Sequence, residues 1–421
     1  MPPSGLTVFV PIRQGDEARL RAVLQAIGND IKGHTLADRA RPHIHFPRST
    51  SIHFARFAIL DDPDRGIERR RLLYSANFDG SLEDHVRELV AVTTDMDAIW
   101  GACEGYESPD NFGTFIAAHA LPFGAFYIAF RDETVGAIRR RAAVGRTWLA
   151  SGRPLPLRGS AESLAARFMG RLRQLVRAAP IVVDVFRAIR RFGLGNVWWA
   201  GRTIVATLGR DPWIALFNRV TGNALPPRQS LFSSVMPDES APLVPLAAGD
   251  EIPSSAVALG PTFREDVVTQ NQLTLVTVVE PRVRARAGAV LAGIDAYAKR
   301  LSPPGSLTGI STIHFVRWLL VDDDRRLMML SDYDGSWEAY IDEFAEMILS
   351  GLDAIWSTSL GFPPDGARDL PAFKRFLRSH QVPSEVFYSA YPEETVLMIA
   401  ADRDRFGGRL PGDERNGGEG R

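Results

Sequence analysis

Two stretches of the sequence place a histidine and an arginine inside the same apolar pattern. IHFARFAILDD occupies positions 52–62, and IHFVRWLLVDD occupies positions 313–323. An imidazole can accept or donate a proton near neutral pH, and a guanidinium can hold an anion. The candidate residues are His53, Arg56, His314 and Arg317.

Alternation along a strand separates the two polar residues of each stretch. Successive side chains of a β-strand point to opposite faces of the sheet. His53 therefore shares a face with Ala55 and Phe57, whereas Arg56 shares the other face with Phe54. We predict that the histidine and the arginine of one stretch do not form one site, and the same holds for the second stretch.

An aspartate followed by glycine comes after each stretch, between a predicted strand and a predicted helix. Asp79 and Asp334 are these aspartates. Both aspartates are among the candidate catalytic residues. The alternative is turn chemistry, in which glycine permits a positive φ and aspartate binds nearby N–H groups. In that structural alternative Arg56 pairs with Asp79 or Asp97, and His53 is a hydrogen-bonded core residue.

A second repeated pattern, F-x-x-F-x-x-x-H, places a histidine beside two phenylalanines. It ends at His119 and at His380. On a helix the three side chains share a face. An imidazole among aromatic rings can be the axial ligand of haem, so His119 and His380 are candidate cofactor ligands. The alternative is a histidine at a helix end that interacts with the last carbonyl groups.

The remaining candidate groups carry weaker signals. His43 and His45 form an H-x-H pair that can chelate a metal from an extended segment, but no third ligand can be named, and we predict no metal site. Nothing marks the lone Cys103 as a nucleophile, because its counterpart in the repeat is Thr358 or Ser359. The sequence has no P-loop and no G-x-S-x-G, H-E-x-x-H or C-x-x-C motif.

The motifs belong to a duplication of the whole pattern of elements. Both copies contain DAIW, at 97–100 and at 353–356, in matching order with the other motifs. Ser81 is a predicted N-cap. In the first copy, apolar periodicity predicts strands over 6–12, 52–60, 71–78 and 125–130, and helices over 16–27 and 81–100.

This order, βαββαβ, is that of the ferredoxin-like unit. One face of such a sheet is left without helices and must be covered. We therefore expect an α+β fold in which two tandem ferredoxin-like repeats form a pseudo-dimeric α+β barrel with a helical insertion.

Arginine is concentrated between the two copies. Residues 139–219 contain 16 Arg, no Lys and 3 acidic residues, a charge of +13, so the rest of the chain carries −14. Residues 163–178 predict an amphipathic helix with arginines on one side, and residues 225–262 read as a linker. Arginine with tryptophan is the composition of an interfacial membrane helix. The alternatives are an insertion packed on the barrel and an anionic partner, with nucleic acid the least expected.

Bulk composition sets the class of protein. The 421 residues are too many for one ordinary core, and 45% hydrophobic with 24% charged residues is typical of globular domains. One cysteine excludes an intrachain disulfide and favours a reducing compartment. The N-terminus lacks a signal-peptide pattern, and no apolar run is long enough for a transmembrane helix. We predict a cytoplasmic protein with peripheral membrane attachment.

The duplicated architecture resembles the dimeric α+β barrel superfamily, which includes dye-decolorising peroxidases, chlorite dismutase-like haem proteins and small cofactor-free monooxygenases. A-N-F-D-G at 76–80 and S-D-Y-D-G at 331–335 resemble the peroxidase G-x-x-D-G motif without its first glycine. The resemblance implies that Asp79 or Asp334 is the acid on the distal side of haem. It implies in addition a distal-side charge from Arg317 or Arg56 and a proximal ligand, His380.

Two functions follow as expectations. The first is an oxidoreductase, peroxidase- or monooxygenase-like, that acts on a lipophilic small molecule at a membrane surface, with haem as the cofactor that the resemblance suggests. The second is a non-catalytic protein that binds membrane or a partner through the basic segment at 160–220. The predicted regions are repeat 1 at 1–136, the insertion and linker at 137–265, repeat 2 at 266–405 and a disordered tail at 406–421.

Overall fold

The computed structural model describes residues 2–31, 43–61, 70–150, 181–208 and 269–406. The predicted helix at 163–178, the linker at 225–262 and the tail beyond 406 lie outside these residues. The chain divides into two compact units. Unit 1 comprises residues 1–120, 130–173 and 384–421, and unit 2 comprises residues 121–129 and 174–383.

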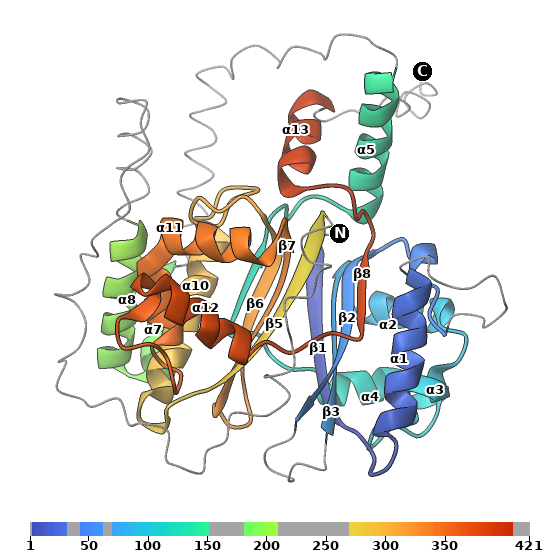
Figure 1. Ribbon diagram of the computed structural model, residues 1–421, viewed down its shortest axis with the longest axis horizontal. Coiled ribbons are helices and arrows are strands. Elements are labelled where there is room, and N and C mark those ends of the chain that lie inside the picture. The colour runs from blue at the N-terminus through green and yellow to red at the C-terminus, as the bar shows by residue number, and fades with distance from the viewer. Residues whose placement is uncertain (1, 32–42, 62–69, 151–180, 209–268, 407–421) are drawn as a thin grey trace. The chain divides into compact units, whose positions relative to one another are not determined.

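Unit 1 is built on a four-stranded antiparallel sheet with strand order β1-β3-β2-β8. Helices α1 to α4 lie along one face of this sheet (Figure 1). The elements are β1 (Pro3–Pro11), α1 (Glu17–Ile31), β2 (Ile52–Asp61), β3 (Arg70–Asp79), α2 (Leu82–Val92), α3 (Met96–Trp100), α4 (Phe112–His119), α5 (Val135–Ala150), β8 (Val386–Ser389) and α13 (Val396–Phe406).

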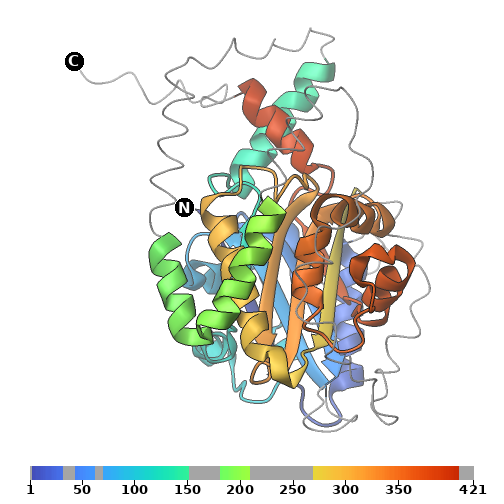
Figure 2. The ribbon, with the colours of Figure 1, turned by 90° about the vertical axis from the view of Figure 1, so that its left-hand side faces the viewer.

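Unit 2 repeats this plan with strand order β4-β6-β7-β5. Two further helices, α7 and α8, pack on α10, on the outer side of this unit (Figures 1 and 2). The elements are β4 (Ala125–Ile128), α7 (Ile181–Phe192), α8 (Leu194–Leu208), β5 (Gln270–Val278), α10 (Arg284–Arg300), β6 (Ile313–Val321), β7 (Arg326–Asp334), α11 (Trp337–Trp356) and α12 (Leu370–Ser379).

The last strand of each repeat belongs to the sheet of the other unit. β8, from the second repeat, pairs with β2, and β4, from the first repeat, pairs with β6. The segment just before each last strand makes a single β-bridge to the first strand of its own repeat. Ala120, before β4, pairs with Val8 of β1, and Gln381, before β8, pairs with Leu275 of β5. The predicted α+β class is confirmed, whereas the two compact units are not bounded as the predicted repeats are, because of this exchange.

The predicted helix over 81–100 is wrong in one respect, since it is two helices, α2 and α3. Ser81 caps α2 as predicted by accepting a hydrogen bond from the Asp84 N–H. Asp95 then begins α3 by accepting a hydrogen bond from the Ala98 N–H. In the second copy α11 is continuous but has non-helical dihedral angles at Ile348, the counterpart of Thr93 at the end of α2. The break is therefore a property of both copies.

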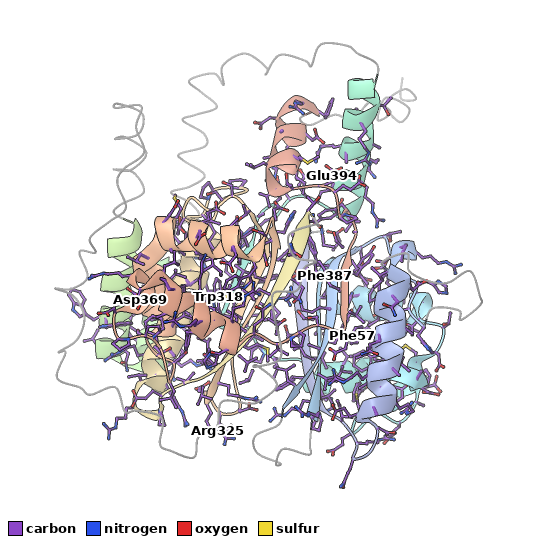
Figure 3. The ribbon with its side chains drawn as sticks, viewed as in Figure 1. Phe57, Trp318, Arg325, Asp369, Phe387 and Glu394 are labelled. Atoms are coloured by element: carbon purple, nitrogen blue, oxygen red, sulfur yellow. The ribbon has the colours of Figure 1, made fainter. Side chains whose placement is uncertain are left out.

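Aromatic side chains fill the space between the sheet and the helices of unit 1. Phe57 of β2 packs on Tyr74 of β3, with ring centroids 4.7 Å apart, and both contact Trp100 of α3. Phe57 is the residue labelled beside β2 in Figure 3. These three residues are buried, and large aromatic groups dominate the energetics of such cores.

Both repeats continue past their last strand into a helix, α5 in the first copy and α13 in the second, and these two helices pack together in unit 1. Ion pairs link the two segments: Glu394 (Figure 3), just before α13, pairs with Arg146 of α5, and Glu133, just before α5, pairs with Arg403 of α13. Burial raises the pKa values of Glu394 and Asp402 above the ordinary range. The first repeat thus extends into the region that composition alone assigned to the insertion.

Candidate functional site

Three polar side chains form a buried hydrogen-bonded chain in unit 1. The Nε2 atom of His53 lies 3.0 Å from Oδ1 of Asp79, and its Nδ1 atom lies 2.8 Å from the hydroxyl of Tyr391. A carboxylate only accepts, so Nε2–H donates to Asp79. In the neutral imidazole Nδ1 then accepts from the Tyr391 hydroxyl. His53 is 1% exposed and Tyr391 is 5% exposed, whereas the side chain of Asp79 is 13% exposed, so the phenol and the imidazole are the members shielded from solvent.

Asp79 carries a second contact that explains its place at the end of β3. Its Oδ2 atom accepts a hydrogen bond of 2.9 Å from the N–H of Val135, the first residue of α5. A helix leaves its first N–H groups without partners, and a carboxylate there is favourable to the helix dipole. The following Gly80 has φ of 94°, so the turn chemistry predicted for this Asp-Gly pair is present as well.

We expect Asp79→Ala to lower the free energy of unfolding by about 2–3 kcal/mol, because a buried imidazole N–H and a helix N–H lose their acceptor. Urea unfolding of the purified chain measures this difference. The control is Asp84→Ala, which removes an exposed carboxylate from the first turn of α2 and is expected to cost much less than Asp79→Ala. Equal costs for the two variants would contradict a structural role for Asp79.

Unit 2 holds the corresponding histidine–carboxylate pair. The Nε2 atom of His314 lies 2.7 Å from Oδ1 of Asp334, and both side chains are buried. The counterpart of Tyr391 in the first copy is Phe130, as the matching motifs FYSAY and FYIAF show. The histidine–carboxylate pair is thus common to both copies, while the phenol belongs to one.

Strand alternation fails at these histidines. Ile52 pairs with Phe78, and Phe54 pairs with Asn77, so His53 is an extra residue in a β-bulge. The same shift occurs between Ile313 and Phe315. The predicted placement of His53 and Arg56 on opposite faces assumes strict alternation, which the bulge interrupts between Ile52 and Phe54, and it stays a prediction.

The two arginines lie further along their strands. Arg56 is the register partner of Phe387 in β8, and Phe387 (Figure 3) stacks with Phe54. The guanidinium of Arg317 lies 4.8 Å from the ring centroid of Phe126. Both arginines are almost fully buried, at 2% and 1% exposure. Asp97, one of the two acids considered as a partner of Arg56, accepts a hydrogen bond of 2.8 Å from the Tyr106 hydroxyl.

His119 and His380 lie at the ends of α4 and α12. Their Nδ1 atoms lie 2.8 Å and 2.7 Å from the carbonyl oxygens of Phe115 and Phe376, four residues earlier. Burial lowers the pKa of His380, although the Phe376 carbonyl acts in the opposite direction. This geometry is that of the helix-end alternative. In this tautomer Nδ1 carries the proton and donates to the carbonyl oxygen, while Nε2 keeps the lone pair that a metal ligand requires.

The distal side of a haem site is not matched by the residues that the resemblance implies. The carboxylates of Asp79 and Asp334 are hydrogen-bonded to His53 and His314. Both are held within the protein, where neither is placed as a free acid beside an open pocket. The described residues do not fit the expected haem site.

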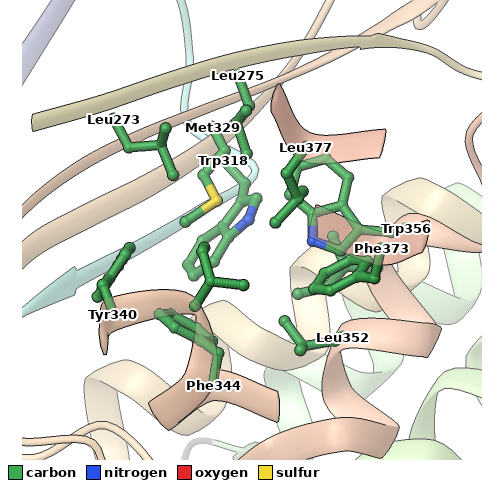
Figure 4. A pocket seen from close by; sticks show the side chains of 12 residues that line it. Leu273, Leu275, Trp318, Met329, Tyr340, Phe344, Leu352, Trp356, Phe373 and Leu377 are labelled. Atoms are coloured by element: carbon green, nitrogen blue, oxygen red, sulfur yellow. The ribbon is translucent and has the colours of Figure 1, made fainter. Parts of the chain in front are cut away.

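A cavity in the core of unit 2 is too small for a ligand. Its volume is about 20 Å³, room for one water molecule. Figure 4 shows that apolar side chains of β5, β6, β7, α11 and α12 surround it. Among the labelled side chains are Trp318, Met329, Tyr340 and Phe344. This cavity is a packing void on the helix-covered face of the sheet.

The other candidate groups gain no partners for chemistry. Nδ1 of His43 lies 3.7 Å from Oδ2 of Asp95, and the N–H of His45 donates to the carbonyl of Val92. No group of three or more His, Cys, Asp or Glu in the described part of the chain could hold a metal ion. Cys103 is buried, which raises its pKa to about 12 and leaves the unreactive thiol form.

A second candidate surface lies on the hairpin of α7 and α8. Large apolar side chains are exposed there: Phe186 at 68%, Leu194 and Trp198 at 67%, and Val183 at 55%. The arginines of α7 that are exposed beside them are Arg187, Arg190 and Arg191. No helix in the described ranges is both long enough and apolar enough to cross a membrane.

Sequence reasoning missed three functional contacts. It did not single out Tyr391, His85 or the repeated Glu88 and Glu343. Glu88 accepts hydrogen bonds from the backbone N–H and the hydroxyl of Thr50 and anchors α2 to the start of β2, and Glu343 accepts from the Thr312 hydroxyl in the second copy. Alignment of the two copies carries the signal for this glutamate, because SLEDHVRE and SWEAYIDE end on it.

Comparison of the chain with protein-family models, with curated proteins and with solved structures gives no match.

Proposed function

We propose that this chain is a peripheral membrane-binding protein that docks on an anionic lipid surface through the hairpin of α7 and α8. The observation that carries the proposal is the exposure of large apolar residues beside arginines on a helix that is otherwise packed. Exposed apolar patches of this kind mark interaction sites. This is the binding alternative rather than the oxidoreductase that the resemblance suggested first.

The outer face of the hairpin has the composition of an interfacial helix. Val183, Phe186, Arg187 and Arg190 follow the spacing i, i+3, i+4, i+7, which places them on one side of α7. Leu194 and Trp198 are one turn apart on α8 and are both exposed. Aromatic and aliphatic groups that enter the headgroup region, with arginines beside lipid phosphates, are the features of such helices.

The inner face of the hairpin is fixed on unit 2. Phe192 packs so closely against Gly288 that a Cβ atom there would lie 2.3 Å from its ring. Arg286 lies over the ring of Trp199, 4.8 Å from its centroid. The single acidic residue of α7, Asp184, is paired with Arg300 at 2.8 Å and with Arg187 at 3.1 Å. The outer face is therefore presented by a packed scaffold, and α7 has no further acid to neutralise Arg190 and Arg191.

Co-sedimentation with vesicles tests the proposal. The full chain is expected to bind vesicles of phosphatidylcholine with phosphatidylserine and to bind vesicles of phosphatidylcholine alone much more weakly. Phe186→Ser with Trp198→Ser is expected to lower the binding constant about hundredfold, since burial of each side chain is worth about 1.5–3 kcal/mol. Arg187→Gln with Arg190→Gln and Arg191→Gln is expected to lower it by a similar factor, at about 1 kcal/mol per arginine.

A matched control is available on α13, where Leu397 and Met398 are also exposed, at 63% and 45%. Leu397→Ser with Met398→Ser is expected to leave vesicle binding unchanged. The proposal would be contradicted if the chain bound neither kind of vesicle, or if the α13 variant lost as much vesicle binding as the variants of the hairpin.

For the fold we propose the tandem ferredoxin-like arrangement of a pseudo-dimeric α+β barrel. The repeated order of elements supports it. A barrel of this kind would cover the face of each sheet that carries no helices.

A second candidate function is an oxidoreductase acting on a lipophilic small molecule at the membrane surface. One observation favours it, the chain of phenol, imidazole and carboxylate formed by Tyr391, His53 and Asp79. A phenol with a base beside it is easier to oxidise than a phenol alone, because the proton has a place to go when the electron leaves. Oxidation of lipophilic phenols by the purified chain, with and without anionic vesicles, tests this candidate.

A further inference from the structure

We propose that Tyr391 is a redox-active residue that gives one electron to an outer-sphere oxidant while its phenolic proton moves to Nδ1 of His53. The proposal rests on the second candidate function above and names its oxidisable group. Burial of the phenol favours electron transfer over direct reaction with a substrate. Tyr391 and His53 are 5% and 1% exposed, so a substrate cannot reach the phenol, whereas an electron can cross several ångströms of protein.

The step balances with the groups in place. The O–H bond of Tyr391 breaks, its electron reduces the one-electron oxidant, and a neutral phenoxyl radical remains. The proton forms a new N–H bond at Nδ1 of His53, 2.8 Å from the phenol oxygen. The resulting imidazolium keeps its Nε2–H bond to Asp79 at 3.0 Å, and the carboxylate stabilises the new positive charge. Reduction of the radical returns the proton along the same hydrogen bond.

A structural role does not account for the phenol. The histidine–carboxylate pair occurs in both units, at His53 with Asp79 and at His314 with Asp334. In the other copy Phe130 stands at the position of Tyr391. Unit 2 therefore has the histidine–carboxylate pair without a phenol at the matching position, so the pair itself does not require one.

Comparison with a second tyrosine–histidine contact shows what the carboxylate adds. Tyr74 lies 3.1 Å from Nε2 of His85, so it too is a phenol beside an imidazole. Burial lowers the pKa of His85 to about 3, and no partner for its Nδ1 occurs among the described residues. His85 is a poor proton acceptor because burial disfavours its cation and outweighs the opposing charge of Glu88, whereas His53 has a directly hydrogen-bonded carboxylate, Asp79. Of these two pairs, the one with the carboxylate is suited to proton-coupled electron transfer.

A third buried phenol supplies a different contrast. The hydroxyl of Tyr388 accepts a hydrogen bond of 3.0 Å from the guanidinium of Arg139. A guanidinium cannot take a proton. Tyr388 is buried like Tyr391 and only three residues away, so it is a matched control for burial and position without a base.

The test is oxidation of the full chain by hexachloroiridate(IV), followed by freeze-quench electron paramagnetic resonance. Protein made with Cβ-deuterated tyrosine is expected to show a narrowed signal, which assigns the radical to tyrosine rather than tryptophan. Tyr391→Phe, which copies the Phe130 of the first repeat, removes the phenol that would carry the radical, so the tyrosyl yield is expected to fall about tenfold or more, or roughly 1.4 kcal/mol or more on a barrier scale. Tyr388→Phe and Tyr74→Phe are expected to keep the parent yield.

Asp79→Asn adds a readout that burial alone would not change. It keeps the shape of the site but removes the charge that stabilises the imidazolium, so the rate of radical formation is expected to fall about tenfold. Absence of a tyrosyl radical in the parent chain, or a full signal in Tyr391→Phe, would overturn the proposal. A radical at Tyr391 without oxidation of any lipophilic phenol would keep this inference and remove the oxidoreductase function on which it was built.

Discussion

Tyr388→Ala is expected to loosen the sheet of unit 1, although Tyr388 belongs to the second repeat. The side chain is buried, and its ring stacks on Phe46 with centroids 4.9 Å apart. Its hydroxyl also holds Arg139. Removing a buried aromatic side chain costs about 3–5 kcal/mol through lost contacts and the cavity that remains. Amide hydrogen exchange is expected to quicken in β2 and β3 and to stay at the parent rate in β6 and β7.

The reciprocal variant is Tyr127→Ala. Tyr127 is the counterpart of Tyr388 in β4 and is 1% exposed, and its register partner is Val316 of β6. Its loss is expected to quicken exchange in β6 and β7 at a similar cost. If each variant instead loosens the sheet that holds the other strands of its own repeat, the placement of β4 in the sheet of unit 2 and of β8 in the sheet of unit 1 is wrong.

Acid is expected to destabilise the protein through His85, by an amount on the order of 5 kcal/mol when the pH has fallen to about 3. Burial lowers the pKa of this imidazole from 6.5 to about 3, and its ring stacks on Phe78 at 4.0 Å. Below about pH 6.5 His85 binds a proton in the unfolded chain but stays neutral in the folded chain until the pH approaches 3. The contribution of His85 is therefore complete above that pH and is lost progressively as the pH falls to about 3.

Urea unfolding at a series of pH values measures this effect, and paired variants isolate it from the carboxylates. The double variant Tyr74→Phe with His85→Phe keeps both rings and removes both ends of the hydrogen bond. Its stability is expected to depend less on pH between about 6.5 and 4, by about 3 kcal/mol. The single variant His85→Phe leaves the Tyr74 hydroxyl without this partner and is expected to cost a further 1–3 kcal/mol at all pH values, roughly as an unsatisfied buried hydroxyl does. A parallel pH dependence of parent and double variant would show that His85 does not titrate as its burial implies.

Local patterns in the sequence predicted the local structure well. Alternating apolar residues predicted β2 and β3, and Ser81 was correctly identified as the cap of α2. The helix break at Thr93 and the bulges at His53 and His314 were not predicted. Apolar periodicity continues across such irregularities, because it records which side is buried and not whether each backbone hydrogen bond is made.

The candidate site was predicted as a set of residues and not as an arrangement. His53, Asp79, His314 and Asp334 were named from repeated motifs, but their pairing depended on the bulge that turns the histidine towards the end of β3. Tyr391 was not named, since it lies 338 positions from His53 along the chain. A contact at that separation leaves no periodic pattern in one sequence.

The sequence by itself predicted the α+β class and a duplicated unit, because the strand and helix periods and the turn residues are local and occur twice, and the structure confirms the class. It also determined which side chains had to be satisfied in a core, since histidine, arginine and aspartate recur inside apolar strands. Only the tertiary structure decided to which sheet each last strand belongs. β4 and β8 have four residues each, and either sheet offers an antiparallel edge of suitable pattern, so the choice depends on packing over the whole chain. That choice brings Tyr391 of the second repeat to His53 of the first and creates the one hydrogen-bonded chain, among the described residues, that joins phenol, imidazole and carboxylate.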